Sequence, residues 1–103
     1  MKTLPISIPL HKIKDFCQSH HIRKLSLFGS VLRDDFTPTS DVDFLVEFES
    51  GKTPGFFKLA QMERELSIII EERKVDLRTP AELSDYFRDR VINEAMVVYD
   101  LHR

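Results

Sequence analysis

The chain has 103 residues, of which 42% are hydrophobic and 31% charged, and its net charge is −2. This length supplies one hydrophobic core, so we expect a single domain over residues 1–103 with the composition of a soluble globular protein. No apolar run approaches the roughly 20 residues that cross a bilayer, and the first residues lack the apolar segment of a signal peptide. The slightly negative charge disfavours direct nucleic-acid binding, and the single cysteine, Cys17, indicates the cytoplasm.

The first half of the chain predicts a helix and two strands. Between Pro9 and about residue 20 the apolar residues fall on one helical face: Leu10, Ile13, Phe16 and Cys17. Leu25 and Leu27 then alternate with polar residues, which predicts a half-buried strand running into Phe28-Gly29-Ser30. Residues 41–48 alternate as a second strand. One side carries Val42, Phe44, Val46 and Phe48, and the other carries Asp41, Asp43, Leu45 and Glu47.

The second half predicts a helix, a short strand and a helix. Apolar residues recur at helical spacing from residue 56 to residue 70, and Asp76 lies between Val75 and Leu77 in a short strand. Thr79, Pro80 and Glu82 form the pattern that caps the start of a helix. The apolar residues of that last helix are Leu83, Phe87, Val91, Ala95 and Val98. We therefore expect an α/β (α+β) domain with a small mixed β-sheet flanked by helices.

Two apolar runs exceed what one helix face can bury. These are Phe56-Phe57 and Ile68-Ile69-Ile70, and consecutive residues on a helix point in different directions. We expect at least one of these side chains to be exposed or to contact a partner.

Two aspartates at the start of the second strand are the first candidates for chemistry. Asp41 and Asp43 point to the same face of a strand, with backbone positions about 6–7 Å apart. Both can reach the same cation, and Mg²⁺ prefers oxygen ligands. Taken alone, an Asp-x-Asp pair is more often a solvated strand edge.

Two further features strengthen the hypothesis. Gly29 and Ser30 follow a strand directly, where glycine lets the backbone approach a phosphate and serine adds a donor. Asp76 lies in a third strand. If that strand neighbours the strand of Asp41 and Asp43, the three carboxylates form a cage able to hold two metal ions.

Together these residues resemble a known pattern. Gly29-Ser30, ten residues, Asp41-x-Asp43 and a later strand aspartate, Asp76, resemble the signature of the DNA-polymerase-beta-like nucleotidyltransferase superfamily. Residues 27–33, 40–46 and 74–80 resemble the MNT (minimal nucleotidyltransferase) family, as do residues 90–92 and 98–99. The resemblance spans nearly the whole chain and implies the polymerase-beta-like nucleotidyltransferase fold.

The resemblance also implies roles for individual residues. Gly29 and Ser30 would grip the triphosphate of ATP, and the catalytic aspartates Asp41, Asp43 and Asp76 would bind Mg²⁺. Arg33 matches a Gly-Ser-x-x-Arg pattern and would also bind the nucleotide. Asp34 follows it where family members often carry glycine.

Short MNT proteins commonly pair with HEPN-domain ribonuclease toxins. The resemblance implies that this chain is an antitoxin that transfers AMP from ATP to a toxin tyrosine. The oligomeric state stays open, with a homo-oligomer or a hetero-oligomer with the toxin as the candidates. A short chain without a lobe for its acceptor agrees with an acceptor positioned by a protein partner. Two alternatives stay open: an antitoxin that masks its toxin without catalysis, and a nucleotidyltransferase acting on a small molecule such as an antibiotic.

Overall fold

A four-stranded mixed sheet lies at the centre of the computed structural model, which describes residues 4–102. Along the chain the elements are α1 (Leu10–Ser19), β1 (Ile22–Phe28), the 3₁₀ turn η1 (Gly29–Leu32), β2 (Val42–Phe48), α2 (Phe56–Ile69), β3 (Val75–Arg78), the 3₁₀ turn η2 (Pro80–Glu82), α3 (Asp85–Glu94) and β4 (Met96–Asp100). The first six of these elements lie close to where the sequence predicts them. No helix among the described residues is long and apolar enough to cross a membrane.

The strand order across the sheet is β3-β2-β1-β4. β1 pairs antiparallel with both β2 and β4, whereas β2 pairs parallel with β3. A parallel pair needs a crossover between its strands, and α2 supplies it. The prediction of a small mixed sheet flanked by helices is therefore confirmed.

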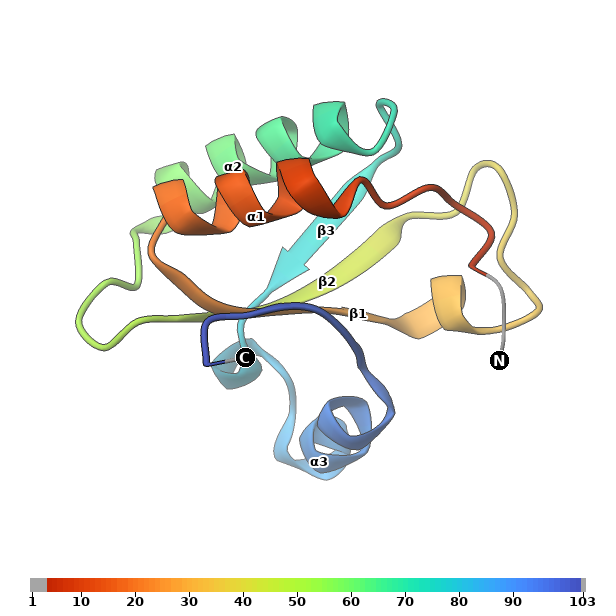
Figure 1. The fold of residues 1–103 in the computed structure, drawn as a ribbon. Helices are drawn as coiled ribbons and strands as arrows, with labels where there is room; N and C mark the ends of the chain where they lie inside the picture. Colours follow the sequence, from red (N-terminus) through yellow and green to blue (C-terminus); the bar gives the residue numbers. More distant parts are fainter. Residues whose placement is uncertain (1–3, 103) are drawn as a thin grey trace.

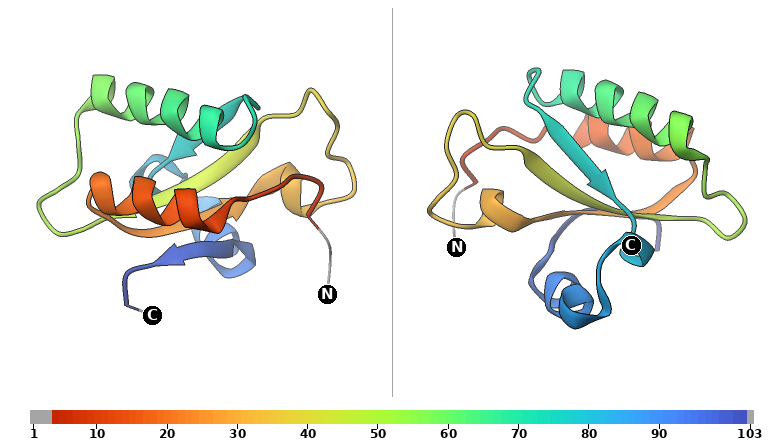
Figure 2. Two further views of the ribbon diagram at one scale, coloured as in Figure 1. Left: turned by 45° about the horizontal axis from the view of Figure 1, so that its top comes forward. Right: turned by 180° about the vertical axis from the view of Figure 1, so that it is seen from behind.

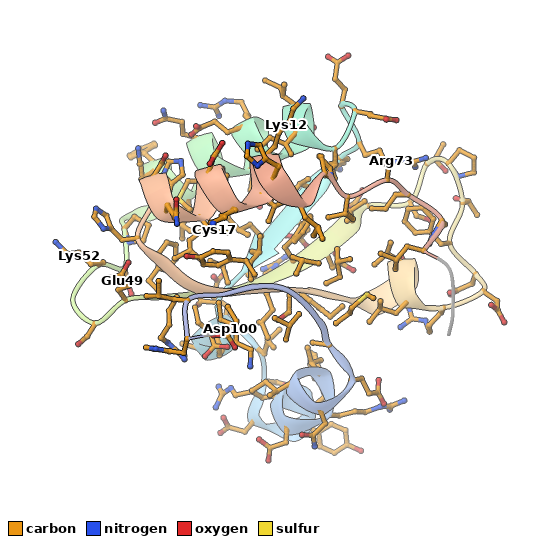
Figure 3. All side chains as sticks on the ribbon, in the orientation of Figure 1. Lys12, Cys17, Glu49, Lys52, Arg73 and Asp100 are labelled. Atoms are coloured by element: carbon orange, nitrogen blue, oxygen red, sulfur yellow. The ribbon has the colours of Figure 1, made fainter. Side chains whose placement is uncertain are left out.

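The helices form two layers around this sheet. α1 and α2 lie side by side over one face, and α3 lies on the other (Figures 1 and 2). The predicted apolar face of α1 is buried through Ile13, Phe16 and Cys17. Cys17 lies on the underside of α1, toward the sheet (Figure 3). The main core is therefore the space between the sheet and the α1–α2 layer.

The end of the chain differs from the prediction. Thr79 and Glu82 do form a local cap, in which the Thr79 amide donates to Glu82 Oε1 at 3.0 Å, but this cap closes only the short turn η2. The backbone is then extended at Leu83, whose side chain is buried, and a separate helix, α3, begins at Asp85. The predicted continuous helix is wrong because burying Leu83 requires the chain to leave the helical path.

Val98 was expected in the last helix and lies instead in a fourth strand. α3 ends at Glu94, Ala95 is extended, and β4 follows. β4 is rich in strand-forming residues and pairs with β1, with Val97 opposite Ser26 and Tyr99 opposite Leu25. The long-range pairing with β1 therefore outweighs the helical spacing of these residues.

Two smaller departures concern burial. Leu45 was expected beside the aspartates on the polar side of its strand, but it is 2% exposed, because both faces of the central strand β2 are covered there. Phe56 was expected on the apolar face of α2, yet it is 87% exposed. The apolar-run prediction is confirmed, since Phe57 and Ile68 are also exposed.

Candidate active site

Three residues on neighbouring strands lie in one row across the sheet. Phe28, the last residue of β1, pairs with Asp43 of β2, and Asp43 pairs with Asp76 of β3. Backbones of neighbouring strands lie about 4.8 Å apart, so the two carboxylates start from adjacent positions. Val42 and Phe44 are fully buried in the main core, so Asp43 points to the opposite face of the sheet, the side of α3. The strand of Asp76 is thus the neighbour that the sequence-based hypothesis required.

A tight turn at the end of β1 brings backbone against Asp43. Gly29 has φ +77°, in the left-handed region, and a Cβ built on it would lie 2.4 Å from Asp43 Oδ2. Glycine fits this position because any side chain would be strained and would overlap the carboxylate. Ser30 follows in the same turn, and Arg33 caps its end. The structure therefore brings Gly29 and Asp43 into direct contact.

The surroundings of Asp43 shift the pKa of its carboxyl group. The pKa of Asp43 is raised from 3.8 to about 6, first by burial and then by the nearby charges of Asp76 and Asp41, against the opposing effect of Arg78 and Arg33. A raised pKa means that the site as it stands disfavours the negative charge on Asp43. Such clusters of like charge are typical of functional sites.

The other two aspartates are held by basic residues. Arg78 Nε lies 3.0 Å from Asp76 Oδ1, and Arg78 Nη1 lies 3.8 Å from Glu82 Oε2. Asp41 lies one residue before β2, and Lys74 Nζ is 4.0 Å from its Oδ1. Both aspartates are partly exposed, so they stay accessible to a ligand.

The acidic side chains suit a metal ion in chemistry but do not converge on one point. Within residues 4–102, no three histidine, cysteine, aspartate or glutamate side chains converge closely enough to hold a metal ion as they stand. The donor set is nevertheless all carboxylate oxygen, which suits Mg²⁺, and the repulsion on Asp43 is the kind that a cation relieves. The residues therefore fit Mg²⁺ chemically, while the cage of Asp41, Asp43 and Asp76 stays a prediction.

Two cavities of about 320 Å³ each meet at Phe28 and Phe87 on the α3 side of the sheet. The first contains the carboxylates and is lined by Phe28, Asp43, Asp76, Arg78, Glu82, Leu83 and Phe87. The second contains the glycine turn and two arginines, and is lined by Phe28, Gly29, Arg33, Phe87, Arg90, Val91 and Glu94. An acidic compartment thus adjoins a basic one.

Of the predicted site residues, Gly29, Asp43 and Asp76 come together most closely, and Arg33 lines the adjoining cavity. Sequence reasoning missed Arg78, Phe87 and Arg90. Arg78 carried a signal, because it lies two residues after Asp76 in the same strand. Arg90 lies in the segment 90–92 that resembles the MNT family, but no pattern assigns Arg90 or Phe87 to the site, because only the fold brings α3 to the turn at Gly29.

The fold and these residues define a class of enzyme, the nucleotidyltransferases, in which a glycine-serine turn lies beside strand aspartates. The family model for the polymerase beta nucleotidyltransferases matches residues 11–103, and the chain belongs to this family. It is 34% identical over 87 residues to a protein of Methanocaldococcus jannaschii, covering 84% of this chain and 90% of that one. It is 32% identical over 88 residues to the protein adenylyltransferase MntA of Thermococcus cleftensis, covering 85% of each.

Solved structures agree with this assignment at the level of the fold. A toxin–antitoxin crystal structure with AMP-PNP superposes with a TM-score of 0.71 at 18% identity, covering 89% of this chain and 73% of that one. The tri-AMPylated HEPN toxin of Shewanella oneidensis in complex with its MNT antitoxin gives a TM-score of 0.64 at 17% identity, covering 88% and 69%. The resemblance to MNT-type nucleotidyltransferases seen in the sequence is confirmed, and the chain is a nucleotidyltransferase.

Proposed function

We propose that this chain is a magnesium-dependent protein adenylyltransferase that transfers AMP from ATP to a tyrosine hydroxyl of a HEPN-domain toxin, and thereby acts as an antitoxin. The observation that carries the proposal is the contact of Gly29 with Asp43, beside Asp76 on the next strand. The turn that we propose to bind phosphate thus lies against two carboxylates. Relatives named for protein adenylylation and for toxin–antitoxin complexes support the acceptor class.

The basic cavity is the proposed place for ATP. Gly29 lines this cavity and Ser30 follows it in the same turn, and Arg33 and Arg90 line the cavity with positive charge. Both arginines now pair with acidic neighbours on the surface, Arg33 with Asp35 and Arg90 with Glu94. Such exposed pairs are weak, so a triphosphate can replace them. Phe28 and Phe87 offer flat apolar surface for the base.

Asp41, Asp43 and Asp76 would hold Mg²⁺ at the boundary of the acidic cavity. When bound, the metal supplies positive charge that polarises the phosphate and offsets the charge developing on it. The protein's own groups position the phosphates and the carboxylates. Gly29 and Ser30 fix the phosphates, and Arg78 holds the Asp76 carboxylate in place through its 3.0 Å contact. The reaction then depends mainly on positioning and electrostatics, as phosphoryl transfers generally do.

The free, buried thiol of Cys17 agrees with a reducing compartment, and we place the protein in the cytoplasm with its toxin. The partner is proposed to supply the acceptor, alone or within a larger assembly of the two proteins.

The experiment is intact-mass analysis of the HEPN toxin partner after incubation with this chain, ATP and Mg²⁺. We expect a mass gain of one or more AMP units with the parent chain, and none with Asp43→Ala or Asp41→Ala. Transfer by these variants at the parental rate would show that the aspartates are not the metal site.

The same analysis separates the alternatives. A toxin that is neutralised without any mass gain would indicate masking by a non-catalytic antitoxin. An unmodified and active toxin, together with nucleotidyl transfer to a small hydroxyl compound, would indicate a small-molecule enzyme.

A further inference from the structure

A third cavity, of about 480 Å³, lies on the other side of the carboxylates, at the outer edge of the sheet. It is lined by Phe56, Leu59, Ala60, Glu63, Asp76, Leu77, Arg78 and Glu82, which belong to α2, β3 and η2. Three of these residues, Asp76, Arg78 and Glu82, also line the acidic cavity. Asp76 therefore stands between a compartment that opens to the glycine turn and one that does not.

The elements around this third cavity differ in chemistry. β3 and η2 contribute the charged groups Asp76, Arg78 and Glu82, whereas α2 contributes the apolar side chains of Phe56, Leu59 and Ala60. Glu63 offers a ligand little further hydrogen bonding, because its Oε2 already accepts a hydrogen bond of 2.8 Å from the Leu77 amide. A molecule that fills this cavity needs an apolar body and one polar tip.

We propose that this cavity is the acceptor site, and that Phe56, Leu59 and Ala60 select an aromatic hydroxyl over an aliphatic one. The inference rests on the proposed function, since it assigns the position of the acceptor in that reaction. A tyrosine side chain has an apolar ring and a polar tip, which matches the apolar and the charged parts of the lining. Serine and threonine lack the ring that would cover the apolar side chains of α2.

The proposed position of the acceptor determines the side from which its hydroxyl oxygen attacks the α-phosphorus. With ATP on the Gly29 side and the phenol on the α2 side, the hydroxyl oxygen approaches the α-phosphorus from the side opposite to the pyrophosphate. The new bond forms between the phenol oxygen and the α-phosphorus, and the bond between that phosphorus and pyrophosphate breaks. The phenol proton is released to solvent, so the products are O-adenylyl tyrosine and pyrophosphate.

The exposed ring of Phe56 forms the outer rim of the cavity. It is 87% exposed, and its neighbour Phe57 is 94% exposed but does not line the cavity. A large aromatic side chain left in water at the mouth of a cavity gains free energy when a ligand covers it. Phe56 and Phe57 thus form a natural pair for comparison, since they differ in whether they face the cavity.

The test measures binding of N-acetyl-tyrosinamide by ¹H–¹⁵N NMR in the presence of Mg²⁺ and α,β-methylene-ATP, which cannot transfer AMP because its α–β bridge is a carbon atom. We expect shifts at the amides of Leu59, Ala60 and Leu77. Ala60→Phe should abolish these shifts by filling the cavity, whereas Gln61→Phe, which adds the same ring at an exposed position, should leave them. N-acetyl-serinamide should produce no comparable shifts. Shifts confined to other residues, or equal binding by Ala60→Phe, would overturn the proposal.

A second pair of variants guards against misfolding by Ala60→Phe. Phe56→Ala should raise the KM for the toxin or the Kd for N-acetyl-tyrosinamide roughly tenfold, with AMP-PNP affinity unchanged, and Phe57→Ala should not change the Kd. An unchanged Kd for Phe56→Ala would contradict the assignment. Tyrosinamide binding is measured without turnover and therefore tests the acceptor site alone. Absence of AMP transfer by the parent chain would instead refute the proposed function.

Discussion

The backbone of Gly29 lies against the carboxylate of Asp43, so closely that a Cβ on residue 29 would be 2.4 Å from Asp43 Oδ2. One residue comes from the end of β1 and the other from β2, and Phe28, just before the glycine, pairs with Asp43 in the antiparallel ladder. The ladder therefore sets the distance between the proposed phosphate-binding turn and the proposed metal ligand. Substitutions at either residue should reveal that coupling.

Gly29→Ala should remove AMP transfer and lower stability. The left-handed backbone alone costs an alanine about 1–2 kcal/mol, and the overlap with Asp43 adds to that. Gly51→Ala is the matched control, because Gly51 has φ +75° but nothing within 4 Å of its Cβ position. Thermal unfolding and AMP transfer should both be measured. Equal stability loss and equal activity in the two variants would show that the contact with Asp43 is unimportant.

Asp43→Asn should stabilise the metal-free protein above pH 6. The pKa of Asp43 is raised from 3.8 to about 6 in the folded chain, so the folded state binds this proton more tightly than the unfolded state. The contribution of this group to the free energy of unfolding is therefore full below about pH 4 and is lost as the pH rises through 6. Denaturant unfolding from pH 4 to pH 8 should show the advantage of the variant growing over that window.

The control for this experiment is Asp89→Asn, at an exposed position of α3. It removes the same charge outside the cluster. An advantage of Asp43→Asn that stays constant with pH, or that Asp89→Asn shares, would contradict the role assigned to the carboxylate cluster.

Cys17 should resist thiol reagents in the folded protein. It is fully buried, and burial raises the pKa of its thiol to about 12, so the reactive thiolate is nearly absent at neutral pH. Labelling with a disulfide reagent at pH 8 should be slow in buffer and complete in denaturant. Rapid labelling of the native protein would mean that α1 opens readily from the sheet.

Glu63→Ala should destabilise the fold by about 1–2 kcal/mol, because it leaves the Leu77 amide on the edge strand β3 without its acceptor. Glu63→Gln keeps an acceptor oxygen and should lose less. Chemical denaturation of the two variants, with Gln61→Ala as an exposed control on the same helix, measures the difference. Equal losses in Glu63→Ala and Glu63→Gln would point to charge rather than to the hydrogen bond.

Much of this architecture could be predicted from the sequence because the signals were local. The spacing of Ile13, Phe16 and Cys17 defines α1, and alternation in residues 41–48 defines β2. The family resemblance then linked the glycine turn to aspartates on neighbouring strands. Strand pairing in the structure agrees, with Asp43 directly opposite Asp76.

The remainder depended on contacts between distant parts of the chain. β4 carries helix-compatible spacing, and its pairing with β1 joins residues 69 to 76 positions apart, which no local pattern reveals. Similarly, Phe87 and Arg90 reach the site only because α3 packs on the face of the sheet opposite α1 and α2 (Figure 1). Phe56 matches the helical spacing of the apolar residues of α2, although it is the first residue of that helix and is 87% exposed.

We propose that Asp41, Asp43 and Asp76 hold a metal ion beside the phosphates of ATP. A crystal structure with AMP-PNP and Mn²⁺ tests it most directly through the anomalous signal of manganese. We predict a peak bounded by Asp41, Asp43 and Asp76, with the phosphates against Gly29 and Ser30. AMP-PNP bound in the structure without a manganese peak at these aspartates, or with its phosphates away from the Gly29 turn, would contradict the account.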